Sequence, residues 1–320
     1  MTVTIRLSQL LIPFFLFFNL VAAAISVNET AASFIIQNDR LYVALNKSTG
    51  VINGLALDKQ DLLGTLNYET PVPGGSTGSG NSGIGPYLDC YCIPSGTYTP
   101  GTIKPEYKLF QGKDADGVAY AGLVMGETYP KTGQRLEFYF FLRDGETGLH
   151  TFSRINYYNS TTPFLRNLQE FRTLFRPNSP LWTHLMTNEK QWAPLPSTNA
   201  TAKEITVQDA TWYLGNTPND PYVQQEADYF TKYTFQDTWR DHKAHGMYAD
   251  GSQSHDGKAY GSWLVMNTVD TYFNGPINSD LTVDGIVYNY ICSNHHGNGT
   301  PNITNGFDRT FGPVSLKSSY

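Results

Sequence analysis

The stretch SFIIQNDRLYVALNKSTG, residues 33–50, decides the fold class of this chain. Apolar and polar residues alternate in SFIIQ and again in RLYVAL, which is the period of two expected of β-strands. Asn38 and Asp39 separate these runs, and such residues favour tight turns between paired strands. Residues 48–50, Ser-Thr-Gly, supply the next turn. We therefore predict an antiparallel meander at the start of the chain.

The same alternation recurs along much of the remaining sequence, at residues 117–125, 135–142, 150–158, 168–175, 261–266 and 283–291. The chain also contains 21 Tyr, 18 Phe and 29 Gly residues, a composition typical of strands joined by turns. The sequence has no internal repeat and no heptad pattern, and the letters GSGNSG at residues 78–83 lack the strand before and the helix after that a phosphate-binding glycine motif requires. We predict an all-β, antiparallel protein with few short helices.

Two stretches depart from this pattern. Residues 71–86, PVPGGSTGSGNSGIGP, contain too much Gly and Ser for a regular element and predict a long loop, either a plain surface loop or a lid over a groove. Residues 177–221 are rich in Pro, Asn and Thr and predict an irregular excursion. We expect Trp182, Trp192 and Trp212 to anchor it against the sandwich. Alternatively, one of them stacks on a sugar ring.

Residues 1–24 hold one early Arg, an apolar run and then alanines, which is typical of a secretory signal peptide. The apolar run is short for a membrane span, and no later segment is longer. We therefore expect a secreted, extracellular protein with residues 25–320 as its mature chain. Six glycosylation sequons agree with export, at Asn28, Asn46, Asn159, Asn199, Asn298 and Asn302.

The formal net charge is -6, and no basic run is present that could neutralise a polyanion. Nucleic acid and anionic membranes are therefore not expected as partners. The three cysteines allow one disulfide at most. On an extended strand the Cα atoms of Cys90 and Cys92 would be about 7 Å apart, too far for a bridge. We expect any bridge to join one of them to Cys292.

The segment TKYTFQDTWRDHKAHGMYADG, residues 231–251, is the most titratable in the chain. Three histidines, His242, His245 and His255, are candidate ligands for a zinc ion. The absence of an HExxH or CxxC pattern argues against it, as does a helical spacing in a chain of strands. We expect no metal and no other cofactor.

The sequence also gives little support to a hydrolase. No GxSxG elbow between a strand and a helix is present, since the letters GGSTG at residues 74–78 fall in the Gly- and Ser-rich loop, and this argues against a serine hydrolase. A glycosidase built on two carboxylates remains an alternative, although spacing singles out no pair among Glu170, Asp237, Asp241, Asp250 and Asp284.

Near the end of the chain, VDGIVYNYICSNHHG places two tyrosines and two histidines close together. Tyr288 and Tyr290 are two apart, so on a strand they share one face. His295 can join them only if the strand bends after Cys292. His296 is the alternative to His295.

Three motifs together carry a family resemblance: EFRTLFR at residues 170–176, the titratable segment 231–251, and VYNYICSNHHGNGTPNITNGFDRTFGP at residues 287–313. With the opening FIIQNDRLYVALNKSTGVINGLALDKQDLL, they resemble the rhamnogalacturonan lyases of polysaccharide lyase family four, fungal secreted type. The resemblance implies a galactose-mutarotase-like antiparallel β-supersandwich. It also implies β-elimination in the rhamnogalacturonan I backbone of pectin, between rhamnose and galacturonate.

By the same resemblance, Lys232 and His295 carry the elimination. Tyr288 and Tyr290 match paired substrate-contacting tyrosines, and Arg172 matches an arginine of the uronate groove. Arg176 is a further, weaker candidate for substrate binding. The chemistry suits these residue types, because an amine must remove the weakly acidic C5 proton while a cation stabilises charge on the adjacent carboxylate.

Fungal members of this family continue into fibronectin-like and carbohydrate-binding domains, whereas this chain ends at Tyr320. We expect those domains to be absent. The closing VSLKSSY does not look like strand sequence, so the sandwich is expected to lack its last strands and to expose an unpaired edge. The alternative to a monomeric lyase is then an inactive, carbohydrate-binding remnant.

Overall fold

The computed structural model describes residues 25–64, 83–93, 96–162, 164–177, 180–188, 190–208, 210–232, 234, 244–266, 272–273, 279–293 and 301–319. Within these ranges the strands pair only in antiparallel fashion. Two short helices accompany them, α1 (Thr198–Thr201) and α2 (Pro221–Gln225). The predicted all-β, antiparallel fold with few short helices is confirmed. None of the helices in these ranges is long and apolar enough to cross a membrane.

The first sheet is the predicted meander, extended by a strand at each end. Its order is β1 (Ser26–Glu29), β2 (Ser33–Gln37), β3 (Leu41–Asn46), β4 (Ile52–Leu57) and β5 (Gln60–Asp61). The turn between β2 and β3 forms because the side-chain oxygen of Asn38 accepts hydrogen bonds from the N–H groups of Arg40 and Leu41, at 3.0 and 2.7 Å. This local bonding fixes the register of the first hairpin.

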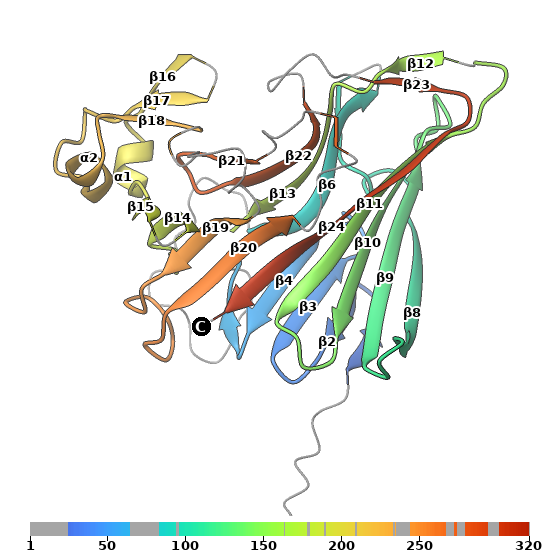
Figure 1. Ribbon diagram of the computed structural model, residues 1–320, viewed down its shortest axis with the longest axis horizontal. Helices are drawn as coiled ribbons and strands as arrows, with labels where there is room; N and C mark the ends of the chain where they lie inside the picture. The colour runs from blue at the N-terminus through green and yellow to red at the C-terminus, as the bar shows by residue number, and fades with distance from the viewer. Residues whose placement is uncertain are drawn as a thin grey trace, which may run out of the picture.

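A nine-stranded sheet forms the largest layer (Figure 1). In sheet order it consists of β15 (Gln191–Pro194), β14 (His184–Asn188), β19 (Ala244–Ala249), β20 (Tyr260–Met266), β24 (Phe307–Ser319), β11 (Gly148–Tyr157), β10 (Arg135–Arg143), β9 (Ala119–Thr128) and β8 (Glu106–Lys113). Strands distant in sequence are therefore neighbours at its centre.

A second five-stranded sheet carries most of the candidate site residues. Its order is β21 (Ser279–Leu281), β22 (Val287–Ser293), β13 (Glu170–Arg176), β6 (Ile84–Ile93) and β7 (Gly96–Tyr98). Two small sheets complete the described part, one of β12 (Phe164–Asn167) with β23 (Asn302–Thr304), the other of β16 (Ile205–Gln208), β17 (Thr211–Tyr213) and β18 (Tyr229–Thr231).

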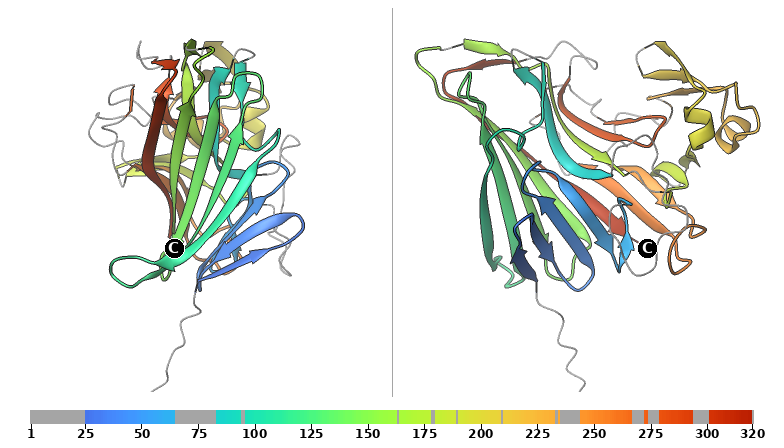
Figure 2. Two further views of the ribbon diagram at one scale, coloured as in Figure 1. Left: turned by 90° about the vertical axis from the view of Figure 1, so that its right-hand side faces the viewer. Right: turned by 180° about the vertical axis from the view of Figure 1, so that it is seen from behind.

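The core lies between these sheets. The meander lies over one face of the nine-stranded sheet (Figure 2), and the Phe34 ring of β2 meets the Tyr107 ring of β8 with centroids 5.0 Å apart. Phe138 and Phe140 of β10 are buried in the same cluster. Burial of each such phenylalanine contributes on the order of 2 kcal/mol. The buried apolar residues of β10, which recur at every second position, thus stabilise the packing of the sheets against each other.

The expectation that the closing VSLKSSY is not strand sequence is wrong. Residues 314–319 belong to β24, which is bonded to β11 on one side and to β20 on the other. The strand also contains Pro313, although proline is disfavoured in central strands. The structure accommodates it at an irregularity of the β11–β24 ladder, between the pairs of Thr151 and Ser153.

The segment 177–221 is less irregular than predicted, since it contains β14 to β17 and α1. These elements are three to five residues long, too short to display a period. Trp182 anchors the segment as expected, because it is buried and its indole N–H donates to the Leu62 carbonyl at 3.1 Å. Trp192, in contrast, is 45% exposed. Of the loop predicted over residues 71–86, residues 71–82 lie outside the described ranges, and residues 84–86 already belong to β6.

The disulfide prediction is also wrong. Cys90 and Cys92 are bonded to each other, and Cys292 is a buried thiol outside this bridge. The pairing of β6 with β7 shifts register between Tyr91 and Ile93, and the Cα atoms of the two cysteines are only 5.3 Å apart. Reasoning from a regular extended strand overestimated their separation. Burial raises the pKa of the Cys292 thiol to about 12, so this thiol is not expected to be reactive.

A close backbone approach gives a stability prediction. A Cβ on Gly50 would lie 2.7 Å from the Cα of Gly101, and the φ of Gly50 is +67°. We expect Gly50→Ala to lower the free energy of unfolding by about 2 to 4 kcal/mol, from backbone strain and overpacking together. Gly145→Ala is the matched control, because its φ is +72° but nothing lies within 4 Å of the added carbon. Equal losses in urea unfolding of the two variants would contradict the steric explanation.

Candidate functional site

The pairing of β13 with β22 brings an arginine beside two stacked tyrosines. Tyr288 and Tyr290 lie on one face of β22, with ring centroids 5.6 Å apart and planes 7° from parallel. Arg172 is the register partner of Tyr290. Its Cζ lies 5.6 Å from the Tyr288 ring centroid and 5.8 Å from that of Tyr290. The predicted same-face tyrosine platform is confirmed, with a cation beside it.

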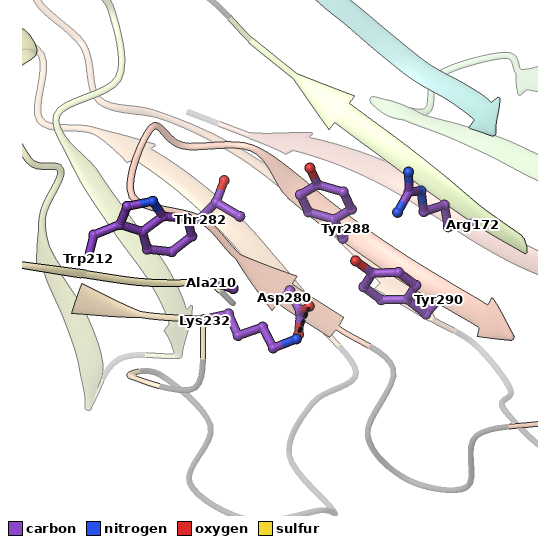
Figure 3. A pocket seen from close by; sticks show the side chains of 8 residues that line it. All are labelled: Arg172, Ala210, Trp212, Lys232, Asp280, Thr282, Tyr288 and Tyr290. Atoms are coloured by element: carbon purple, nitrogen blue, oxygen red, sulfur yellow. Dashed lines mark ion pairs between the residues drawn. The ribbon is translucent and has the colours of Figure 1, made fainter. Parts of the chain in front are cut away.

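These side chains line a pocket of about 240 Å³ (Figure 3). Its lining residues come from β13, β21 and β22, from the residue after β21, and from the small β16–β18 sheet with the residues next to its strands: Arg172, Ala210, Trp212, Lys232, Asp280, Thr282, Tyr288 and Tyr290. Four residues predicted from separate motifs are therefore brought together, namely Lys232, Arg172 and the two tyrosines. His295 and His296 lie outside the described residues, so their roles stay predictions.

Lys232 is delivered to the pocket by the small β16–β18 sheet. It directly follows β18, and its backbone N–H donates to the Ala210 carbonyl at 3.0 Å. Its side chain is only 5% exposed, and its Nζ lies 3.8 Å from Oδ2 of Asp280, which is 3% exposed. The amine is thus largely removed from water and faces a buried carboxylate across the pocket.

Asp280 was missed by sequence reasoning, although a signal for it exists. Asp284 and Gly285 form a turn signal between two strands, and a hairpin with a three-residue loop, residues 283–285, places Asp280 opposite Tyr288. This is the register that β21 and β22 adopt. Counting outward from the turn would therefore have placed a carboxylate beside the tyrosine platform.

Arg172 is held by two acids. Its Nε donates to Oδ2 of Asp89 at 2.8 Å, its Nη2 lies 2.7 Å from the same oxygen, and its Nη1 lies 2.5 Å from Oε2 of Glu170. Burial acts to lower the pKa of Arg172, but the two carboxylates outweigh it and raise the pKa above the ordinary value. The guanidinium is therefore charged at every pH the fold tolerates. A guanidinium has five N–H donors, and these contacts account for three, so two are left for a ligand.

The tyrosines are neutral hydroxyl groups at physiological pH. Burial raises the pKa of both Tyr288 and Tyr290 above the ordinary value. They can donate and accept hydrogen bonds but are not bases near neutrality. Arg176, the last residue of β13, is not part of the pocket lining. Its charge opposes the effect of burial on Tyr288, so it lies near that tyrosine.

The buried Lys232–Asp280 pair gives a second stability prediction. Asp280→Asn is expected to lower the free energy of unfolding by about 3 kcal/mol, because it leaves a buried ammonium without its carboxylate. Adding Lys232→Met should restore part of that loss, since removing both charges costs less than removing one. Unfolding of the single and double variants in guanidinium chloride measures the loss of stability and its partial recovery. A double variant less stable than Asp280→Asn would contradict the pairing.

The histidines named above as candidate zinc ligands take structural roles where the structure describes them. His245 Nε2 lies 2.6 Å from the Tyr288 carbonyl, and His255 contacts Gln60 through its Nδ1 at 2.9 Å. His242 lies outside the described residues. Across the ranges given above, no three His, Cys, Asp or Glu side chains are arranged to hold a metal ion.

A two-carboxylate glycosidase is not favoured by the pocket. Such enzymes need two carboxyl groups flanking the scissile bond. Among the described lining residues Asp280 is the sole carboxylate, and Glu170 is bound to Arg172. Asp284 is exposed and accepts a hydrogen bond from Thr282. Asp250 is exposed and bonded to Ser252, while Asp237 and Asp241 lie outside the described residues.

The sequons differ in accessibility. Asn28, Asn199 and Asn302 are exposed. Asn46 and Asn159 are half-buried, and their side-chain oxygens accept hydrogen bonds from the residues that follow them. Asn298 lies outside the described residues.

Comparison with known proteins agrees with the resemblance found in the motifs. Residues 181–278 match the family model described as "Probable rhamnogalacturonate lyase B middle domain". The chain is 60% identical over 308 residues to a probable rhamnogalacturonate lyase B of Aspergillus niger. The matched region covers 96% of this chain and 42% of that protein. It is also 60% identical over 291 residues to rhamnogalacturonate lyase B of Emericella nidulans, covering 91% and 42%.

A solved structure of galactose 1-epimerase from Lactobacillus acidophilus shares 13% identity and a TM-score of 0.39, covering 92% of this chain and 98% of that one. A putative aldose 1-epimerase from Escherichia coli shares 12% identity with the same TM-score, covering 93% and 100%.

The chain is thus similar over most of its length to proteins named as lyases. Within that class it is homologous to the rhamnogalacturonate lyases, as the three motifs predicted. It spans about two fifths of the length of the curated relatives it matches.

Proposed function

We propose that this chain cleaves the rhamnogalacturonan I backbone of pectin by β-elimination between rhamnose and galacturonate. One observation carries the proposal: Lys232, Arg172, Tyr288 and Tyr290 come from distant parts of the sequence and line one pocket. The chain's high identity to rhamnogalacturonate lyases supports the same substrate class.

The proposed reaction uses this pocket as follows. Lys232, paired with Asp280 at rest, first gives up its ammonium proton to solvent. The resulting amine removes the C5 proton of the galacturonate, and the electron pair forms the C4–C5 double bond as the bond from C4 to the glycosidic oxygen breaks. Arg172 binds the carboxylate through its two remaining donors and stabilises the charge that develops there. His295 is proposed to protonate the departing oxygen, which completes the proton balance.

The neighbouring groups support these roles. Asp89 and Glu170 orient the Arg172 guanidinium, so little rearrangement is needed when the carboxylate binds. Asp280 faces the Lys232 amine and stabilises the ammonium that forms as the proton is taken. The neutral tyrosine hydroxyls are placed to bond the sugar ring. Removal of water from the pocket strengthens each of these interactions.

The finer features of the proposal are an endolytic mode, secretion, glycosylation and a monomeric state. The sequence of residues 1–24 and the exposed sequons Asn28, Asn199 and Asn302 support export and glycosylation. An endolytic enzyme should lower the viscosity of the polymer before much ultraviolet absorbance develops. An exolytic enzyme should give absorbance first.

The test is to incubate the purified chain with rhamnogalacturonan I and to follow the ultraviolet absorbance of the unsaturated uronate. Absorbance that rises together with reducing ends supports elimination. Reducing ends without absorbance would indicate a glycosidase, and binding without either would indicate a non-catalytic remnant. Homogalacturonan, which lacks rhamnose, is the substrate control.

A further inference from the structure

The pocket has two ends of different chemistry. Figure 3 shows Arg172 at one end and Trp212 at the other, with Asp280 and Lys232 between them. The Arg172 end supplies a cation and the tyrosine hydroxyls. The Trp212 end is formed with Ala210 and Thr282.

Polar groups are scarce at the Trp212 end. The Thr282 hydroxyl already donates to Oδ1 of Asp284 at 2.6 Å. Ala210 contributes only a methyl group beyond its backbone. Trp212 makes no side-chain hydrogen bond within the described part of the chain. Its indole N–H and its ring can therefore both contact a ligand bound at this end of the pocket.

The Trp212 ring packs against another aromatic ring of the same small sheet. It is half-buried on β17, where it is the register partner of Phe230 on β18, and their ring centroids are 6.0 Å apart at 60°. The same small sheet leads directly into Lys232. The apolar wall and the proposed base are therefore fixed by one rigid element, at a defined distance from each other.

The geometry points to Trp212 as the platform for the deoxysugar of the repeat, which it binds by stacking while Arg172 binds the neighbouring uronate. This inference rests on the proposed function and specifies its selectivity. A 6-deoxyhexose presents a methyl group and a C–H face but no charge, which suits an aromatic surface. A uronate in its place would bring a carboxylate against an apolar wall, at a desolvation cost. The wall thus selects the alternating polymer over homogalacturonan.

The experiment compares Trp212→Ala and Trp212→Phe with Trp192→Ala, an exposed tryptophan outside the pocket lining. Trp212→Ala is expected to raise KM for rhamnogalacturonan roughly tenfold, equivalent to about 1.4 kcal/mol. Trp212→Phe, which keeps a ring against Phe230, should raise it less, and Trp192→Ala should leave it unchanged. An unchanged KM in both Trp212 variants would overturn the inference.

A second readout does not depend on turnover. Oligosaccharides of rhamnogalacturonan are titrated into the Lys232→Ala variant and tryptophan fluorescence is recorded. Adding Trp212→Phe should remove the fluorescence change, whereas adding Trp192→Phe should keep it. A change that persists without Trp212 would refute the platform. Absence of lyase activity in the wild type would refute the proposed function instead, and this titration would still decide the role of Trp212.

Discussion

Replacing Lys232 with Ala is expected to reduce the elimination rate by at least about 10³-fold, because the pocket then lacks the amine that accepts the C5 proton. Lys232→Arg should be as inactive, since a guanidinium keeps its proton and cannot act as a base. The initial rate of ultraviolet absorbance measures both variants. If Lys232 served only as a positive charge, Lys232→Arg would retain much of the activity.

Two controls separate chemistry from folding. Lys258 is an exposed lysine whose Nζ lies 3.5 Å from Asp256, and Lys258→Ala should leave the rate unchanged. Circular dichroism and thermal melting establish that the Lys232 variants are folded. A small primary amine added to Lys232→Ala should restore part of the rate, which a merely structural lysine would not allow. Full activity of Lys232→Ala would remove this residue as the base.

The pH dependence of the rate constrains the assignment further. Arg172 has its pKa raised by Asp89 and Glu170 despite burial, and burial raises the pKa of Tyr288 and Tyr290 above the usual value near 10. None of these groups loses its proton below about pH 10. A rate that rises with pH below that value therefore reports a group other than these three, and the rate profile of the wild type between about pH 5 and about pH 10 measures it.

The sequence predicted the strands with regular alternation and failed where the backbone is irregular. β2 and β10 were found because their apolar residues keep a strict period. The closing part of β24 was missed because VSLKSSY does not resemble the aromatic strand sequence expected there. The short strands of the segment 177–221 were missed because they are too brief to show a period. The Cys90–Cys92 bridge depends on an irregularity in β6 that no local pattern announces.

The site was predictable only in part, for a different reason. Tyr288 and Tyr290 follow from strand geometry alone, since residues two apart share a face. Lys232 and Arg172 had no local signal that distinguishes them from surface cations, and only the family resemblance selected them. Trp212 lines the same pocket through long-range strand order, which brings the β16–β18 sheet to β13, β21 and β22. Such contacts depend on topology rather than on sequence spacing.

Arg172→Lys is expected to lower kcat/KM on rhamnogalacturonan by about 10² to 10³-fold, although the positive charge is kept. A lysine cannot reproduce the planar donor set that binds Asp89, Glu170 and a uronate carboxylate together. The loss should fall mainly in kcat, because charge on the carboxylate grows towards the transition state. Steady-state kinetics on the folded variant measures this division.

Arg154→Lys is a matched control for the structural part of this effect. Arg154 on β11 also bonds two acids, Asp308 through its Nε and Nη2 and Glu137 through its Nη1, but it lies outside the pocket lining. Both substitutions remove a two-acid contact, so both should lower the melting temperature. Only Arg172→Lys should lower kcat/KM. If the two variants lost stability and kept equal activity, Arg172 would be a structural ion-pair partner rather than the group that binds the uronate.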